Sequence, residues 1–192
     1  MTKPLALSHR IRLRDMAPDE KVRVYTWQHV EGWEASKERG HLTGSHGRPH
    51  EEDLWDRPYE WMRSAMAERI PGFSGDLPVW TWLKRENPRR AHWIRDRVRI
   101  IADVPRGRML LSDYELWHMP LNRGAICLTP EEDEAYPHDT AGDAIMDTWH
   151  HVLDIVGGPH RTRDWLGVPD TIQACVDRIR VDEIVSVRMP GR

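Results

Sequence analysis

The stretch LLSDYELWH, which begins at Leu110, gathers side chains that can take part in catalysis. Asp113 ends an apolar run that is typical of a strand, and Tyr114 and His118 follow within five residues. A carboxylate there can stabilise a developing positive charge, and an imidazole can accept or donate a proton near neutral pH. The same residues also fit a structural interpretation, in which Ser112 and Asp113 only cap a turn. The sequence favours neither interpretation over the other.

Sequence motifs that would assign a reaction directly are absent. The chain has no Gly-x-Ser-x-Gly nucleophile motif, no Walker motif and no Gly-x-Gly-x-x-Gly motif. Cys175 lies among apolar residues and is typical of a core thiol rather than a nucleophile. His41, His46 and His50 share a polar loop, but their spacing fits no zinc signature. We therefore predict solvated histidines and no metal site.

Length and composition indicate one globular domain. The 192 residues are enough for one core. A content of 39% hydrophobic and 31% charged residues excludes a disordered chain. A net charge of -3 gives no overall attraction to nucleic acid or to a membrane surface. No apolar run approaches the roughly 20 residues that a membrane helix needs. With only Cys127 and Cys175 as thiols, we expect a cytoplasmic protein without disulfides and without membrane contact.

Hydrophobic periodicity predicts an α+β domain over residues 22–192, preceded by a flexible basic arm over residues 1–21. Gly40 is expected to end the first helix, and Pro58 to begin the second. Trp80 and Trp82 fall on one face of a strand, because side chains alternate along it. The expected strands are 22–28, 77–84, 98–105, a strand from 107 that turns at 112–113, 171–179 and 183–190, and the expected helices are 30–39, 59–70 and 141–155.

Tryptophan is frequent and phenylalanine is rare. The chain holds ten Trp and one Phe, and a buried indole needs a partner for its N–H group. We expect most of the Trp residues in the core and several at half-buried edges or in a binding site. Segment 84–108 is rich in Lys and Arg and is accompanied by Trp82 and Trp93. This mixture suits contact with single-stranded nucleic acid, and the alternative is a solvated strand paired with the acidic stretch 131–147.

Several short segments resemble an uncharacterised bacterial family of unknown function. The segments are YTWQ, YEWMRSAM, PVWTWL, LLSDYELWH and IQAC. The resemblance covers most of the chain from residue 24 onward, and it implies no activity.

A more distant resemblance is to ADP-ribosyltransferases, which open with a strand, a helix and a glycine. The sequence YTWQ at 25–28, followed by Trp33 and Gly40, is similar in layout. In the toxins that ADP-ribosylate DNA, a late strand reads Gln-Ala-Glu with a catalytic Glu, and Gln173-Ala174-Cys175 stands in the corresponding place. MLLSD is similar to their central Thr-Asp segment. This chain departs from the pattern with Thr26 where the family has His, and with Cys175 where it has Glu.

The resemblance implies an α+β fold of split antiparallel sheets with a cleft that binds NAD or a related nucleotide. It implies cleavage of the glycosidic bond and transfer of the ribosyl group, although catalysis without the Glu stays open. Asp113 or Asp177 is the candidate replacement for that carboxylate. The residues expected at the ligand are Tyr25, Trp27 and Trp61 for stacking, Thr26 beside them, Gln28 and Gln173 for hydrogen bonding to the ribose or amide, Asp113 near the positive charge and His118 as acid or base.

Two other hypotheses remain beside this one. The first is a non-catalytic module that binds nucleic acid or a protein through the Trp residues and segment 84–108. The second is a metal hydrolase built on the loop that follows His41. The sequence predicts no particular oligomeric state.

Overall fold

The computed structural model describes residues 5–44, 52–84, 97–136, 142–158, 161, 165–167, 169 and 171–190. Within them the chain forms an α+β fold, as expected, around an antiparallel sheet with strand order β5-β6-β3-β1-β4-β8 and a separate two-stranded ribbon β2-β7. The strands are β1 (Lys21–Gln28), β2 (His41–Leu42), β3 (Val79–Trp82), β4 (Val98–Pro105), β5 (Met109–Asp113), β6 (Ile172–Val176), β7 (Ile179–Arg180) and β8 (Ile184–Arg188). The helices are α1 (Leu7–Asp15), α2 (Val30–Arg39), α3 (Glu52–Arg69), α4 (Tyr114–Leu121), α5 (Pro130–Ala135) and α6 (Asp143–Thr148), with 3-10 turns η2 (Arg106–Arg108), η3 (Trp149–Leu153) and η4 (Val181–Glu183).

The sheet has a narrow junction between β1 and β3. Strand β1 pairs with β4 along all of its eight residues, whereas its ladder with β3 consists of the pair Tyr25–Trp82. A side-chain link adds to this junction: Thr26 Oγ1 donates to the carbonyl of Trp80 at 2.9 Å, and Gln28 Nε2 donates to Thr26 Oγ1 at 2.8 Å. The structure therefore has one sheet, with a narrow junction between β1 and β3 that we call the seam, where two separate half-sheets were expected. The detailed likeness to ADP-ribosyltransferases stays a prediction.

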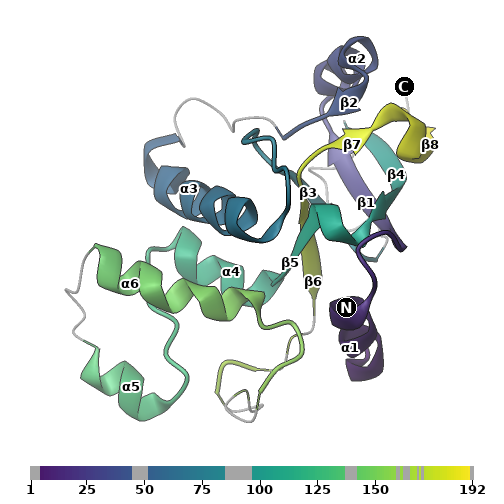
Figure 1. The fold of residues 1–192 in the computed structure, drawn as a ribbon. Helices are drawn as coiled ribbons and strands as arrows, with labels where there is room; N and C mark the ends of the chain where they lie inside the picture. Colours follow the sequence, from purple (N-terminus) through teal and green to yellow (C-terminus); the bar gives the residue numbers. More distant parts are fainter. Residues whose placement is uncertain are drawn as a thin grey trace.

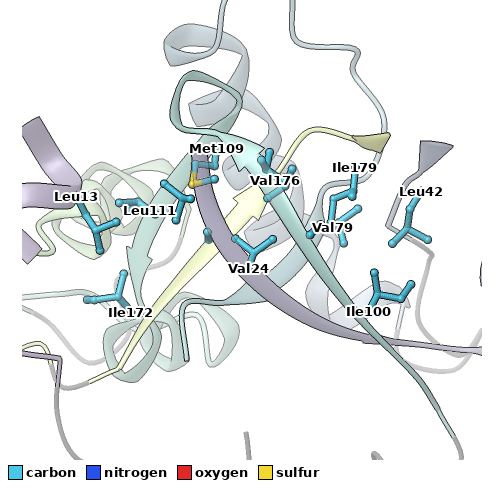
Figure 2. Close-up of a cluster of buried hydrophobic side chains, with 14 of the residues drawn as sticks. Leu13, Val24, Leu42, Val79, Ile100, Met109, Leu111, Ile172, Val176 and Ile179 are labelled. Carbon is cyan, nitrogen blue, oxygen red and sulfur yellow. The ribbon is translucent and has the colours of Figure 1, made fainter. Parts of the chain in front are cut away.

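Each face of the sheet has its own apolar core. The first core lies on the face of Val24, Ile100 and Leu111, where α1, α2 and β2 contribute Leu13, Trp33 and Leu42. Figure 2 shows Val24, Val79 and Ile100 from neighbouring strands meeting in this cluster. Strand β4 explains why the core forms here, because Val98, Ile100, Ala102 and Val104 alternate with partly exposed residues.

The second core lies on the opposite face of the sheet, over β5 and β6. Met62 and Met66 of α3 pack there with Trp117 of α4 and with Leu110 and Cys175 of the sheet. Figure 1 shows α3, α4 and α6 grouped on the side of β3, β5 and β6, while α2 and β2 lie near β1 and β4. The part of this face over β1, β4 and β8 carries a different set of side chains, described below.

The N-terminal segment differs from the expected flexible arm. Residues 7–15 form α1, and Leu13 is 3% exposed within the first core. Arg10 is also buried, and its Nη1 donates to the carbonyls of Ile155 and Val156, both at 3.0 Å. The Arg-rich composition suggested an arm, but a helix places Leu13 and the stem of Arg10 on one side, one turn apart.

Other elements differ at their boundaries. Helix α3 begins at Glu52, so Pro58 lies inside the helix rather than at its start. The expected turn after Ser112 is the N-terminus of α4. The expected helix over 141–155 is divided into α6 and the 3-10 turn η3. Among the described helices, none combines the length and apolarity that crossing a bilayer requires.

The position of α1 gives a first prediction. Replacing Leu13 with Ala should lower the free energy of unfolding by about 2–5 kcal/mol, because the substitution leaves a cavity in the first core. Leu7 lies on the same helix and is 50% exposed, so Leu7→Ala should change stability by less than about 0.5 kcal/mol. Urea denaturation of the two variants and the parent measures both values. Equal, small effects would mean that α1 does not pack on the domain.

Candidate functional site

Four side chains stand in a row across three neighbouring pairs of strands. Ser112 of β5 is opposite Gln173 of β6, Gln173 is opposite Trp82 of β3, and Trp82 is opposite Tyr25 of β1. Residues directly opposite one another in a sheet point to the same face and lie about 5 Å apart. We call Ser112, Gln173, Trp82 and Tyr25 the polar-aromatic row. It crosses the seam between β3 and β1.

The buried end of this row carries polar atoms without partners. Ser112 is 0% exposed and Gln173 is 3% exposed. Ser112 Oγ and Gln173 Nε2 are both buried, and neither has a hydrogen-bond partner among the residues that the structure describes. Leaving such a group unpaired costs about 1–3 kcal/mol, so buried polar groups in folded proteins are nearly always paired. Two such atoms lie on adjacent, facing residues, which makes this end of the row the candidate functional site.

Helix α4 adds two aromatic rings to the partly exposed end. The Tyr114 ring meets the Trp82 ring edge-on with 4.8 Å between centroids, and the His118 ring meets Tyr114 at 4.8 Å. Tyr114 and His118 are neighbours because four residues make about one helical turn. Trp82, Tyr25 and Tyr114 are each partly buried, and His118 is exposed. The row therefore runs from a buried polar end towards an accessible aromatic end.

The hydrogen bonds of His118 define its tautomer. His118 Nδ1 lies 3.0 Å from the carbonyl oxygen of Tyr114 and 3.3 Å from that of Glu115. A carbonyl oxygen only accepts, so Nδ1 carries the hydrogen and donates it. In the neutral imidazole the lone pair is then on Nε2. An exposed His118 held in this way can act as a base through Nε2.

Asp113 has its charge balanced inside the fold. It is 0% exposed, and its Oδ1 accepts hydrogen bonds from the backbone nitrogens of Glu115 at 2.8 Å and Leu116 at 3.2 Å. Its Oδ2 accepts from Arg161 Nη2 at 2.6 Å, and Arg161 is itself 7% exposed. These contacts support the structural interpretation of LLSDYELWH: Asp113 caps α4 and fixes its start.

The four residues of YTWQ are divided between the two faces of the sheet. Tyr25 and Trp27 point to the face of the polar-aromatic row, and Thr26 and Gln28 point to the face of the first core. Thr26 is 2% exposed, and both Thr26 and Gln28 take part in the link across the seam. The structure therefore brings Tyr25 to the row, places Trp27 6% exposed in the next row along β1, and gives the other two a structural role.

Trp61 lies apart from the row, within the second core. Its ring contacts Trp117 at 6.5 Å and Trp149 at 6.0 Å between centroids. Cys175 also faces this core and is 0% exposed. Burial raises the pKa of the Cys175 thiol well above its ordinary value, so the thiol is protonated at neutral pH and cannot replace a carboxylate. Asp177 accepts hydrogen bonds from the backbone nitrogen and the hydroxyl of Ser74.

The basic segment 84–108 divides into parts with different roles. Arg106 donates to the carbonyls of Leu13 and Met109, and Arg108 pairs with Glu183, so both serve the fold. Residues 85–96, including Trp93, lie outside the described residues. Because the guanidinium groups of Arg106 and Arg108 already bind atoms of this chain, these two residues do not supply the phosphate contacts that the nucleic-acid hypothesis requires.

Within the described part of the chain, no group of three His, Cys, Asp or Glu side chains lies where it could hold one metal ion. His41 is described, and its Nδ1 lies 3.1 Å from the carbonyl oxygen of Arg39. His46 and His50 lie outside the described residues.

Sequence reasoning missed the pairing that makes the row. Ser112, Gln173 and Trp82 belong to three strands, and only the register places them side by side. One signal was available: Ser112 and Gln173 are polar residues inside the short apolar segments MLLSD and IQACV. A polar side chain in a strand that is buried along its whole length needs a partner.

Comparison with known proteins gives a family and no activity. The family model described as a domain of unknown function (DUF3841) matches residues 23–162. No curated protein and no solved structure matches the chain.

The ion pair of Asp113 gives a second prediction. Arg161→Met should lower the free energy of unfolding by about 3–5 kcal/mol, because it leaves a buried carboxylate without its cation. The double variant Asp113→Asn with Arg161→Met should be less destabilised than Arg161→Met alone, since no uncompensated charge remains. Thermal and urea unfolding of the single and double variants measure this coupling. Additive losses would show that the two groups do not act as a pair.

Cys175 gives a third prediction, which can be measured in a Cys127→Ala background. A thiol whose pKa is raised by burial stays protonated and unreactive at pH 8, whereas the same thiol in unfolded protein reacts readily. Spectrophotometric thiol titration in buffer and in guanidinium chloride compares the two states. Equally fast labelling of native protein would show an accessible, ionised thiol.

Proposed function

The chain belongs to the family whose model it matches, a domain of unknown function (DUF3841), and we propose that it binds NAD or a related nucleotide on the polar-aromatic row. The observation that carries the proposal is the buried end of the row, beside Trp82, where Gln173 Nε2 and Ser112 Oγ have no hydrogen-bond partner in the described part of the chain. A ligand that supplies those hydrogen bonds removes the energetic cost of leaving them unpaired.

The chemistry of the row favours a flat, neutral, hydrogen-bonding group. An amide and a hydroxyl offer donors and acceptors but no charge, so they suit a carboxamide or the edge of a nucleobase. Trp82 and Tyr25 are partly buried rings next to these groups, and Tyr114 lies edge-on to Trp82. Aromatic side chains stack on any nucleobase, and each stacked base adds about 1–3 kcal/mol to the binding free energy. Nicotinamide and adenine both meet this description.

His118 is the residue that fits a catalytic role at this site. Its Nε2 lone pair can accept a proton from a water molecule as the water attacks the ribose carbon of the glycosidic bond. The carbon–nitrogen bond breaks as the water attacks, so that the ribosyl group carries positive charge in the transition state and nicotinamide leaves with the bonding electrons. Asp113 does not stabilise the resulting positive charge in this proposal, because its carboxylate is already neutralised by Arg161.

The direct test is a titration of the protein with NAD, followed by tryptophan fluorescence and by analysis for free nicotinamide. Saturable quenching supports nucleotide binding, because Trp82 lies in the row. Release of nicotinamide that is lost in His118→Gln supports the catalytic role of His118. Absence of any fluorescence change and of any binding by calorimetry would overturn the proposal.

The unpaired polar atoms give a fourth prediction, in which stability and binding change in opposite directions. Ser112→Ala and Gln173→Met should leave the free energy of unfolding unchanged or raise it by about 1 kcal/mol, since each removes an unsatisfied group. The same variants should weaken NAD binding about tenfold or more, because hydrogen bonds to the ligand are lost.

Thr81→Val is the matched control for these variants. Thr81 is also buried, but its hydroxyl already donates to the carbonyl of Ala174 at 2.9 Å. Its replacement should cost about 1 kcal/mol of stability and leave NAD binding unchanged. If Ser112→Ala and Gln173→Met destabilise the protein and bind NAD as the parent does, their polar atoms serve an internal network and not a ligand.

A further inference from the structure

The buried hydroxyl groups in the described part of the chain share one kind of partner, with a single exception. These hydroxyls belong to Thr26, Ser36, Thr81 and Ser112. The first three each donate to a backbone carbonyl oxygen of this chain, at 2.9, 2.6 and 2.9 Å respectively. Ser112 Oγ has no such partner among the described residues. A carbonyl oxygen is therefore the group that buried hydroxyls bind in this fold, and it is the group that Ser112 lacks.

Gln173 supplies a second donor next to Ser112. The two residues are opposite each other in the ladder of β5 and β6, so their side chains point to the same face about 5 Å apart. An amide nitrogen carries two N–H donors and accepts nothing, so Gln173 Nε2 lacks an acceptor. A hydroxyl can donate as well, and the two groups do not bond each other. The buried end of the row thus presents two neighbouring donors.

Two neighbouring donors distinguish between the rings of a dinucleotide. A carbonyl oxygen has two lone pairs and can accept from both donors, whereas a ring nitrogen has one lone pair. Adenine carries ring nitrogens and no carbonyl group, while nicotinamide carries a carboxamide. Ser112 and Gln173 therefore favour nicotinamide over adenine, a choice that stacking on Trp82 and Tyr25 leaves open.

The surroundings of the two donors increase this selectivity. The next row on the same face consists of Leu110, Cys175 and Trp80, and Leu110 is 8% and Cys175 0% exposed. A hydrogen bond is stronger in such apolar surroundings than in water. A site built to hydrogen-bond one group also rejects analogues that lack it, because its buried polar atoms are then left unpaired.

We infer that Ser112 and Gln173 hold one carbonyl oxygen between them, so that the ligand of the polar-aromatic row is selected by a carbonyl group on its aromatic ring. We call this pair the carbonyl cradle. The inference deepens the proposed function and rests on it for the nucleotide attached to the ring. Trp82 follows Gln173 in the row, one strand spacing of about 4.8 Å further on, so a ring bound in this way extends towards Trp82 and β1.

The experiment is calorimetric titration with three dinucleotides that differ only in the group on the pyridine ring. NAD carries the carboxamide, 3-acetylpyridine adenine dinucleotide keeps the carbonyl oxygen without the amide nitrogen, and thionicotinamide adenine dinucleotide has sulfur, a weak acceptor, in place of the oxygen. The acetyl compound should bind within about twofold of NAD. The thioamide compound should bind about tenfold more weakly, because two hydrogen bonds are weakened.

Gln173→Met assigns this preference to the cradle. Methionine is close to glutamine in size, so the variant removes the donor without making room for sulfur. NAD should bind about tenfold more weakly to the variant, and the thioamide compound should then bind about as well as NAD. Thr81→Val is the matched control, because its hydroxyl already has a carbonyl partner, and it should keep the tenfold preference.

Three results would overturn the carbonyl cradle. The first is equal binding of NAD and the thioamide compound by the parent protein, and the second is binding of the acetyl compound as weak as that of the thioamide compound. Both are measured on the unsubstituted chain and do not depend on the folding of a variant. The third is a tenfold preference that persists in Gln173→Met.

Free nicotinamide and thionicotinamide separate this inference from the proposed function. If no dinucleotide binds, the proposed function fails, and the two free bases are titrated at millimolar concentration. Binding of nicotinamide that exceeds that of thionicotinamide, and that Gln173→Met abolishes, would support the carbonyl cradle alone. Absence of binding by either base would overturn the cradle as well. Binding of NAD without any preference among the three dinucleotides would leave the proposed function standing and overturn the cradle.

Discussion

The buried ion pair between Asp113 and Arg161 is the interaction on which the arrangement of this face depends. Asp113 is the last residue of β5 and the cap of α4, so its position determines where the helix leaves the sheet. Arg161 reaches it across 48 residues of sequence and also donates to the carbonyls of Gly167 and Asp154. Both groups are buried, and each neutralises a charge that the interior would otherwise not tolerate. Because Asp113 fixes the start of α4, the ion pair also determines where the side chains of Tyr114 and His118 project from that helix.

The two faces of the sheet carry different kinds of side chain. One face is apolar from strand to strand and holds the first core. On the opposite face the helices cover the second core over β5 and β6, and the part over β1, β4 and β8 carries charged residues of both signs, among them Arg23 and Asp103. From Ser112 to Arg188 the side chains thus change from buried and neutral to exposed and charged.

Local patterns in the sequence predicted much of this architecture. The alternation in YTWQ and VWTW gave the strands and their faces, and Gly40 ends α2 with a φ of 78°, as a left-handed cap requires. Helix α1 was missed because its stability comes from contacts with residues near Ile155, far along the chain. The candidate site was only partly predictable for the same reason. Gln173 and Tyr25 were named from the sequence, but the strand register that aligns them with Ser112 is a property of the whole sheet.

The seam between β1 and β3 has a consequence for cooperativity. With the ladder reduced to Tyr25–Trp82, the strands β5-β6-β3 and β1-β4-β8 resemble two folding units that share one hydrogen-bonded contact and a side-chain link. A molecule that touches Trp82 on β3 and Tyr25 on β1 would join these units. Its binding energy would then suppress opening of the seam as well as global unfolding, and amide hydrogen exchange in the two groups of strands would converge to one rate class.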